Sequence, residues 1–322
     1  MSETDVRAYR PGDEHGILAM YRSVFGLDHS VETWRWLYER FPHGPAIIVV
    51  AENNGELVGH YAVQPRPFSF GGEDTLAGLV LGTMIEQKAR NVTLLIEMAK
   101  LAYKLCADRG LRFLYAFPRE EVMRVRQMLL SWQTLAMIVE WEGPLPQLPA
   151  SPTPRAVPRR YSLIEKPSER LDRPQMIDPS MIYSLRDAAW LKWRIFDNPL
   201  VQYDVHAIGD ANQPVAYAVT KLCYREDVLY GHIVDWHGEI NDPSVREDLL
   251  AGIWRRFAER NVERFSCWAN RQNSLGKALQ KAGYKEQGQS TSWGFRSLGS
   301  TATEWLANRD AWHVLMADSD TY

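Results

Sequence analysis

Asp235 and His237 are the side chains whose types and spacing suggest chemistry most directly. They flank Trp236 in a predicted extended segment, where residues two apart point to the same face. A carboxylate beside an imidazole could bind a hydroxylated or amino compound where two lobes of the chain meet. The alternative is a strand end whose polar groups simply satisfy one another by hydrogen bonding. The spacing leaves both interpretations open.

The cysteines add no further chemistry. Cys106, Cys223 and Cys267 have neither the spacing of a disulfide framework nor that of metal ligands, so we expect no metal cofactor. Cys106 lies in a predicted helix beside Leu101 and Leu105, so we expect a small core residue rather than a nucleophile. This cysteine usage fits a reducing cytoplasm.

The sequence that must position these residues contains an internal repeat. Both halves contain, in the same order, a tryptophan, a proline, a Tyr-Ala-Val segment and an Ala-acidic-Arg segment, at 36, 42, 61–63 and 107–109 and again at 193, 199, 217–219 and 258–260. Six prolines crowd the stretch from Pro144 to Pro158, which predicts a semi-rigid linker. We therefore expect domains at 1–143 and 161–322, joined by a linker at 144–160.

Composition excludes several other classes of protein. The 322 residues are 45% hydrophobic and 24% charged, as in soluble globular proteins, and the length suits two domains. The net charge of −3 and the lack of a dense Lys/Arg stripe argue against nucleic acid as a partner. The polar N-terminus is no secretory signal and no apolar run could span a bilayer, so we expect a cytoplasmic protein without a membrane span.

Hydrophobic patterning predicts a mixed α/β (α+β) fold in each half. In the first half we expect a helix after Asp13, a hairpin turn at Asn53-Asn54-Gly55, strands at 6–11, 46–51, 57–64, 75–85, 112–117 and 136–141, and helices at 31–40, 91–107 and 120–130. In the second half we expect helices at 181–195, 245–259 and 274–282 and strands at 205–208, 215–223, 228–234, 264–268 and 290–295. The tail at 301–322 is either an edge strand around 312–316 or a solvated terminus.

This element order resembles the GCN5-related N-acetyltransferase (GNAT) fold, in a tandem arrangement. The segments that carry the resemblance are the hairpin at 53–60, the strand end at 82–85, the strand at 111–118 and the Trp-Arg motif at 193–194. The resemblance implies two GNAT-like domains, each a mixed, mostly antiparallel, twisted sheet flanked by helices. It is strongest to tandem members associated with polysaccharide and amino-sugar pathways.

The family resemblance also implies where acetyl-CoA or another acyl-CoA would bind as co-substrate. In the family, backbone N–H groups at the start of the long helix hold the diphosphate, and glycines permit its close approach. Here the loop carries Lys88, Arg90, Asn91, Val92 and Thr93, so the arginine is present and the glycines are absent. Asparagine tolerates a left-handed conformation at 91, whereas a β-branched threonine at 93 is disfavoured at positive φ. Its hydroxyl could donate to a phosphate, or its bulk could block one.

The matching loop of the second half, 238–243, is acidic and contains a proline, so it would repel an anion. Any CoA site therefore belongs to the first half, and the second half is a degenerate copy that could shape the acceptor pocket.

Catalytic roles follow from the same resemblance. Glu86 is a candidate base, the alternative being a solvated loop carboxylate. Tyr115 could protonate the departing thiolate or simply pack in the sheet. Backbone N–H groups near Met84 and Ile85 would stabilise the oxyanion. His60 either contributes to the acceptor site or is structural. The tyrosine that usually serves as the acid in the following helix has no counterpart near 129–132.

The expected reaction is direct acyl transfer from a CoA thioester to a primary amine, with an amino sugar as the favoured small-molecule acceptor. Two alternatives remain open. The chain could be a non-catalytic scaffold or sensor, or it could use an acyl carrier protein or aminoacyl-tRNA as donor. The sequence indicates no oligomeric state.

Overall fold

The structure is a computed structural model that describes residues 4–70, 72–146, 159–166, 181–210, 213–238, 241–270, 274–286, 291–299 and 303–321. Contacts between Cα atoms divide the chain into two compact units, 1–137 with 291–309 and 138–290 with 310–322. Each unit therefore combines segments from both halves of the sequence. Most of the predicted linker at 144–160 lies outside the described residues.

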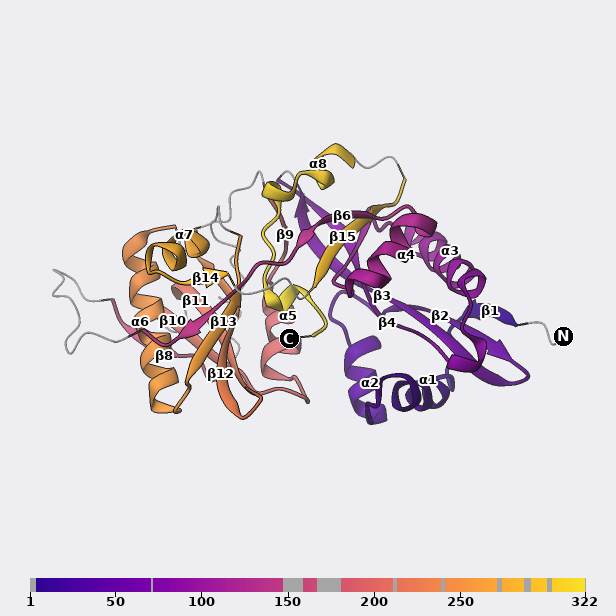
Figure 1. The fold of residues 1–322 in the computed structure, drawn as a ribbon, viewed down its shortest axis with the longest axis horizontal. Coiled ribbons are helices and arrows are strands. Elements are labelled where there is room, and N and C mark those ends of the chain that lie inside the picture. Colours follow the sequence, from indigo (N-terminus) through magenta and orange to yellow (C-terminus); the bar gives the residue numbers. More distant parts are fainter. Residues whose placement is uncertain are drawn as a thin grey trace. The chain divides into compact units, whose positions relative to one another are not determined.

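The first unit is built on one mixed sheet with the strand order β1-β2-β3-β4-β5-β15-β6 (Figure 1). All neighbours pair antiparallel except β4 and β5, which are parallel. Its strands are β1 (Asp5–Ala8), β2 (Ile47–Asn53), β3 (Glu56–Phe70), β4 (Glu73–Ile85), β5 (Phe113–Ala116), β15 (Ser292–Ser297) and β6 (Gln133–Met137). β15 comes from the far end of the chain, so the sheet is completed only after the second unit has been traversed.

Local sequence explains the hairpin and the first helices. Asn54 and Gly55 adopt φ of 51° and 80°, as a tight turn between β2 and β3 requires. Ser30 caps the helix that follows it, because its hydroxyl accepts from the backbone N–H of Thr33. The helices of this unit are α1 (Glu14–Met20), η1 (Tyr21–Phe25), α2 (Val31–Tyr38), η2 (Gln87–Ala89), α3 (Val92–Asp108), α4 (Glu120–Leu130) and α8 (Thr303–Ala307). The short helix η5 (Arg309–Ala311) begins at the last residue of this unit.

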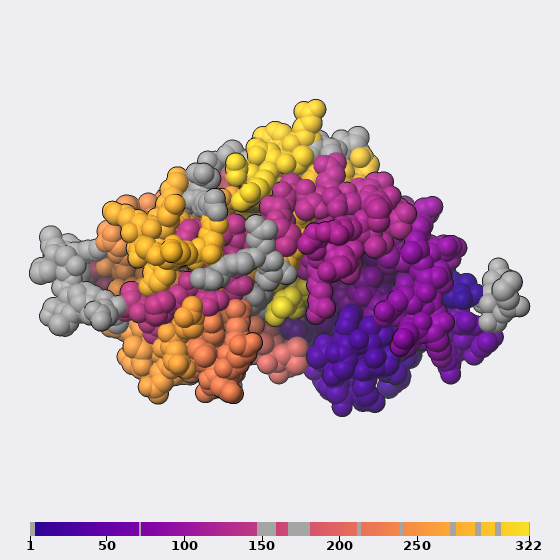
Figure 2. Space-filling view, viewed as in Figure 1, coloured from indigo at the N-terminus to yellow at the C-terminus, as the bar shows by residue number. Residues whose placement is uncertain are grey.

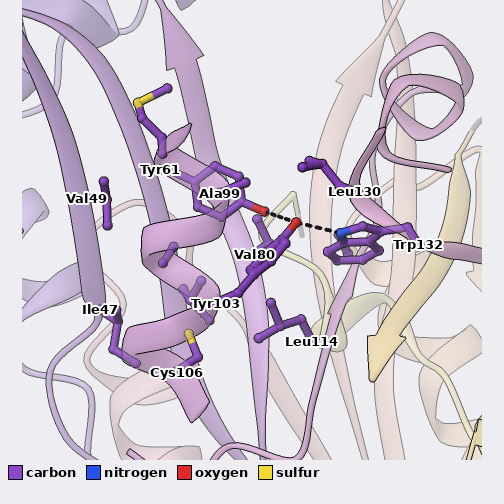
Figure 3. Close-up of a cluster of buried hydrophobic side chains, with 14 of the residues drawn as sticks. Ile47, Val49, Tyr61, Val80, Ala99, Tyr103, Cys106, Leu114, Leu130 and Trp132 are labelled. Carbon is purple, nitrogen blue, oxygen red and sulfur yellow. Dashed lines mark hydrogen bonds between the residues drawn. The ribbon is translucent and has the colours of Figure 1, made fainter. Parts of the chain in front are cut away.

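Two buried clusters cover the two faces of this sheet. One joins α3 and α4 to strand residues such as Tyr61, Val63 and Leu114, and Figure 3 shows part of it. The other joins α1 and α2 to Ile48, Val50, Ala62, Leu81 and Met84. α3 and α4 lie side by side on the first face (Figure 1), and their purple and magenta residues form a continuous part of the surface of this unit (Figure 2). Cys106 is fully buried in the first cluster, which confirms the prediction of a core residue.

The second unit repeats this layout with the strand order β8-β10-β11-β12-β13-β7-β14. Again only the central pair β12 and β13 is parallel. The strands are β7 (Glu140–Pro144), β8 (Tyr161–Leu163), β9 (Ile182–Ser184), β10 (Asp204–Asp210), β11 (Gln213–Arg225), β12 (Val228–Gly238), β13 (Arg264–Trp268) and β14 (Lys285–Glu286), with β9 outside this order. The helices are α5 (Ala188–Leu191), η4 (Lys192–Phe196), α6 (Pro243–Glu259), α7 (Ser274–Lys281) and η6 (Met316–Asp318).

The two sheets exchange equivalent strands. β7 follows β6 along the chain, yet it pairs with β13 and β14 in the second unit. β15 takes the corresponding place between β5 and β6 in the first unit. A single strand predicted at 136–141 is therefore wrong, because residues 136–137 and 140–141 lie in strands of different sheets. The two strands are separated by Ile138 and Val139.

Two other predictions of secondary structure need correction. The helix expected at 181–195 is wrong. The segment forms β9, three residues without regular structure and the short helices α5 and η4, because Asp187 caps α5 by accepting from the N–H of Trp190. The tail contains no strand among its described residues 303–321. Only Trp312 makes an isolated parallel bridge with Ile182, and residues 315–319 are buried.

Candidate functional site

The start of α3 is capped by a side chain rather than by a glycine turn. Asn91 is the N-cap in an extended conformation, with φ −148°, and its Oδ1 accepts from the N–H of Leu94 at 2.7 Å. Its Nδ2 donates to the carbonyl of Ala89 at 3.0 Å. The expected left-handed Asn91 is therefore wrong. Thr93 is the second residue of the helix and not at positive φ, so the predicted strain at this threonine does not arise.

Backbone donors at this helix start are available for a ligand. The first N–H groups of a helix have no partner within the helix, and no hydrogen bond to the described residues engages those of Val92 and Thr93. Both residues are exposed, Val92 by 50%. The 17 residues of α3 place the positive end of the helix dipole here. The arrangement can bind an anion through the main chain without glycines.

The charged side chains around this helix start differ in how freely they could contact an anionic ligand. Arg90 is exposed, and no carboxylate of the described chain lies within ion-pair distance of it. Lys88 is paired with Glu56, Nζ to Oε2 at 2.5 Å, and both side chains are well exposed. Glu86 is partly buried and accepts a hydrogen bond from the hydroxyl of Ser23 on η1. Arg90 is therefore the main cation for a ligand, and Glu86 lies toward the α1 side of β4.

β4 and β5 separate before β4 ends. Their parallel register runs only from Ala77↔Phe113 to Leu79↔Tyr115, whereas β4 continues to Ile85. Beyond residue 79 the backbone groups of β4 that face β5 have no strand partner in the described sheet. Met84 and Ile85 lie in this stretch, still paired with β3. A ligand chain could therefore hydrogen-bond to β4 as an additional strand would.

A β-bulge at Gly82 lies within this unpaired stretch. The register with β3 shifts between Ala62↔Leu81 and His60↔Met84, and Gly82 has φ 56°. His60 is completely buried, and its Nδ1–H donates to the carbonyl of Gly82 at 2.6 Å, with the tautomer fixed by that acceptor. Burial lowers the pKa of His60 to about 4, so the imidazole is neutral. This environment favours the structural interpretation of His60.

Tyr115 lies away from the helix start. By strand alternation it faces opposite to Leu114 and Ala116, which belong to the α3 cluster. Its ring is 1% exposed and packs edge-on against Phe68, with ring centroids 5.1 Å apart. The packing role that the sequence left open for Tyr115 fits this position.

Sequence reasoning missed Arg126, on the inner face of α4. The residue is 4% exposed, and its Nη2 donates to the hydroxyl of Thr83 at 3.2 Å. The guanidinium lies over the indole of Trp132, with Cζ 4.8 Å from the ring centroid. The indole N–H of Trp132 donates to the hydroxyl of Tyr103 at 2.8 Å, and this hydroxyl also contacts that of Tyr61 (Figure 3). The only signal in the sequence was an arginine at helical spacing from buried Met123 and Leu130.

In the second unit, Asp235 and His237 do come together, 3.1 Å apart between Oδ1 and Nε2. Asp235 is fully buried and accepts from Nε of Arg186 at 3.0 Å, and the same guanidinium donates to Asp318 at 2.7 Å. The Arg186 charge holds the pKa of Asp235 well below its usual range. These contacts fit the alternative of a hydrogen-bonded strand end, tied to the C-terminal segment.

The helix start equivalent to that of α3 is occupied by the protein itself. Asp242 caps α6, and its Oδ1 accepts from both the N–H and the hydroxyl of Ser244 at 2.8 Å. Arg159 donates to Asp242 and Ser244. The carboxylate satisfies a donor that α3 leaves open. Residues 239 and 240 of the predicted acidic loop lie outside the described chain.

Across the described ranges, no group of three or more His, Cys, Asp or Glu side chains is arranged to hold a metal ion. Within the same ranges, no helix is long and apolar enough to cross a membrane.

Residues 5–126 match the family model described as an acetyltransferase (GNAT) domain. This segment is therefore similar to a GNAT acetyltransferase domain. The matched segment spans the sheet from β1 to β5 with α3 and most of α4, and it supports assignment of the chain as an acyltransferase. No curated protein matches the chain.

Solved structures share the fold over 92% of this chain. A probable N-acyltransferase from Enterococcus faecalis has a TM-score of 0.68 at 10% identity, with 73% of its own chain covered. A GCN5-related N-acetyltransferase from Anabaena variabilis has a TM-score of 0.67 at 12% identity, also with 73% covered. Eis1 from Mycobacterium abscessus has a TM-score of 0.62 at 14% identity, with 74% covered. At these identities the likeness establishes the two-sheet fold.

Proposed function

We propose that the first unit transfers an acyl group from a CoA thioester to a primary amine. The observation that carries the proposal is the combination of the open backbone N–H groups of Val92 and Thr93 with the unpaired end of β4. The donor's diphosphate would bind the N–H groups of Val92 and Thr93, with Arg90 and Lys88 nearby, and Asn91 would keep the helix start rigid. Its pantetheine arm would pair with β4 along Met84 and Ile85.

The reaction is a direct transfer. The neutral amine attacks the thioester carbonyl, the C–N bond forms, the C–S bond breaks, and the electron pair leaves with sulfur. N–H groups of the β4 bulge, near Met84, would stabilise the oxyanion. Glu86 would accept the amine's proton, directly or through water, because it lies just after the end of β4. Its hydrogen-bond partner, the hydroxyl of Ser23, does not neutralise the carboxylate.

We infer that the second unit is a degenerate copy of the first. The repeated strand order, the single parallel pair and the 17-residue helix after β12 support a duplication. Its capped helix start and the carboxylate of Asp242 disfavour a diphosphate. The acceptor that we favour is an amino sugar, from the resemblance to tandem members in polysaccharide pathways, and the setting is the cytoplasm.

A thermal-shift experiment with acetyl-CoA tests this function. Saturating acetyl-CoA should stabilise the protein, by about 2.7 kcal/mol at a hundredfold excess over Kd. Arg90→Glu should abolish the shift, because it places a negative charge beside the diphosphate. Arg124→Glu on the exposed side of α4 is the matched control and should keep it. A wild-type protein without any shift would contradict the proposal.

Two other functions remain as outcomes of that experiment. A scaffold or sensor would bind no acyl donor. A transferase that uses an acyl carrier protein would ignore acetyl-CoA yet release its product when a loaded carrier is supplied. An aminoacyl-tRNA donor is disfavoured by the net charge of −3.

A further inference from the structure

Arg126 is a buried cation that has no counter-ion in the described part of the chain. It is 4% exposed, and its Nη1 has no hydrogen-bond partner among the described residues. No carboxylate of the described chain lies within 4.0 Å of its guanidinium nitrogens. Its partners are the hydroxyl of Thr83 and the faces of Trp132 and Tyr61, with Cζ 4.8 and 6.0 Å from the ring centroids. A buried charge that is left unpaired destabilises a fold, so this one requires a reason.

The position of Thr83 indicates where the missing anion would lie. Thr83 follows the bulge at Gly82 and stands four residues beyond Leu79, the last residue of β4 that pairs with β5. Arg126 reaches this point from α4, on the face where Tyr61, Trp132 and α3 form one cluster. The start of α3 is the proposed diphosphate site. A donor bound there would run along β4 from the helix start toward Thr83 on this same face.

Three anions could meet the guanidinium: a carboxylate of the acceptor, a carboxylate on the acyl group, or the sulfur that leaves. Glu86, the proposed base, lies toward α1 through its hydrogen bond with Ser23, so the acceptor amine would approach the acyl carbon from the α1 and α2 face. The sulfur stays with the donor on the α3 and α4 face. The geometry therefore favours sulfur, whose negative charge appears only as the C–S bond breaks.

We propose that Arg126 stabilises the departing CoA thiolate through N–H donation from Nη1, oriented by the hydrogen bond from Nη2 to Thr83. This inference rests on the proposed acyl transfer. As the C–S bond breaks, the electron pair passes to sulfur beside the guanidinium, while the amine's proton goes to Glu86 or solvent. The arginine loses no proton. It supplies charge stabilisation in a helix that offers no tyrosine near 129–132.

The test needs no acceptor, because CoA itself is the probe. The ultraviolet thiolate absorption of bound CoA is titrated against pH, with desulfo-CoA as the blank. An opposite charge within 4–6 Å lowers a pKa by about one to three units, so the bound thiolate fraction at neutral pH should exceed that of free CoA about tenfold or more. Arg126→Gln should remove this increase, and Arg126→Lys should retain part of it.

Controls separate charge from folding. Arg124→Gln, an exposed arginine on the same helix, should leave the thiolate fraction unchanged. Thr83→Val keeps the charge but removes the acceptor that orients it, and it should lose part of the increase. This variant decides the question if Arg126→Gln does not fold.

The outcomes distinguish the two proposals. If wild type does not bind CoA, the proposed function fails. If CoA binds and its thiol titrates as in free solution, or if Arg126→Gln and Thr83→Val leave an increased thiolate fraction intact, the acyl-transfer proposal stands and the role of Arg126 is overturned.

Discussion

Nη2 of Arg126 donates to the hydroxyl of Thr83 across 3.2 Å, and this contact joins α4 to the unpaired end of β4. The two residues belong to elements on either side of the split between β4 and β5. Trp132, after the end of α4, covers the same guanidinium and hydrogen-bonds through its indole N–H to Tyr103 of α3. One buried network thus sets the positions of α3, α4 and β4 around the proposed donor site.

Gly82→Ala should destabilise the first unit. A Cβ at this position would lie 2.4 Å from the hydroxyl of Tyr38 and 2.5 Å from that of Tyr21, in addition to strain at φ 56°. We expect the free energy of unfolding to fall by about 1–3 kcal/mol in addition to the effect of the conformational strain, as in other overpacked cores. Gly110→Ala is the control, since Gly110 also has positive φ but no atom within 4 Å of the added Cβ. Urea unfolding of the two variants measures the difference, and equal losses would refute the overpacking.

Asp235→Asn should lower the free energy of unfolding by about 3–5 kcal/mol, because it breaks a buried ion pair with Arg186. The pKa of Asp235 is lowered in the folded protein, so its contribution is present above the unfolded value of about 3.9 and is lost as pH falls below it. The difference between wild type and variant should therefore shrink in acid. Asp108→Asn, which removes an exposed pair with Lys104, should change stability by about 1 kcal/mol or less. A pH-independent difference at Asp235 would argue against this account.

His60→Phe should reduce the sensitivity of the fold to mild acid. Burial lowers the pKa of His60 to about 4, below the unfolded value of about 6.5, so the unfolded chain binds the proton first. Stability conferred by neutral His60 is present above pH 6.5 and declines toward pH 4, by about 1.4 kcal/mol per pH unit. The variant loses the hydrogen bond to Gly82 and is less stable near neutrality, but its stability should fall less steeply in this window. Urea titrations at several pH values compare the slopes, and parallel slopes would count against a buried neutral histidine.

Cys223 should be the cysteine that reacts in the folded protein. Cys106 and Cys267 are completely buried, and burial raises the pKa of the Cys106 thiol to about 12. Cys223 is only partly buried. Iodoacetamide labelling of the native chain followed by peptide mass spectrometry should find one modified site, and Cys223→Ser should remove it. Rapid labelling of Cys106 would contradict its place in the core between α3 and the sheet.

The sequence was informative where structure is local. The start of the helix at residue 31, the Asn54-Gly55 turn and the apolar face around Cys106 depend on neighbours within a few residues, and each was predicted. The family resemblance gave the order of elements and the position of α3. At residue 91 it suggested a left-handed asparagine, although the same side chain could cap the helix, which is what it does.

Features that depend on distant partners were not accessible. The exchange of β7 and β15 depends on pairing between residues far apart in the sequence, such as Cys267 with Trp141, 126 positions away, and Phe295 with Gln133, 162 positions away. The local sequence of residues 182–184 resembles the start of a helix, and it does not reveal that Ile182 forms a β-bridge with the distant Trp312. Arg126 looked like the exposed Arg124, because only Thr83, Tyr61 and Trp132 reveal its burial.

The most direct test of the central claim is calorimetric titration of acetyl-CoA into wild type and Thr93→Glu. A glutamate in the first turn of α3 interacts favourably with the helix dipole, so the unliganded variant should be as stable as wild type or more so. It also places a carboxylate where the diphosphate would bind. We predict one acetyl-CoA per wild-type chain and no measurable binding to the folded variant. Equal affinities, or binding to neither protein, would contradict a donor site at the start of α3.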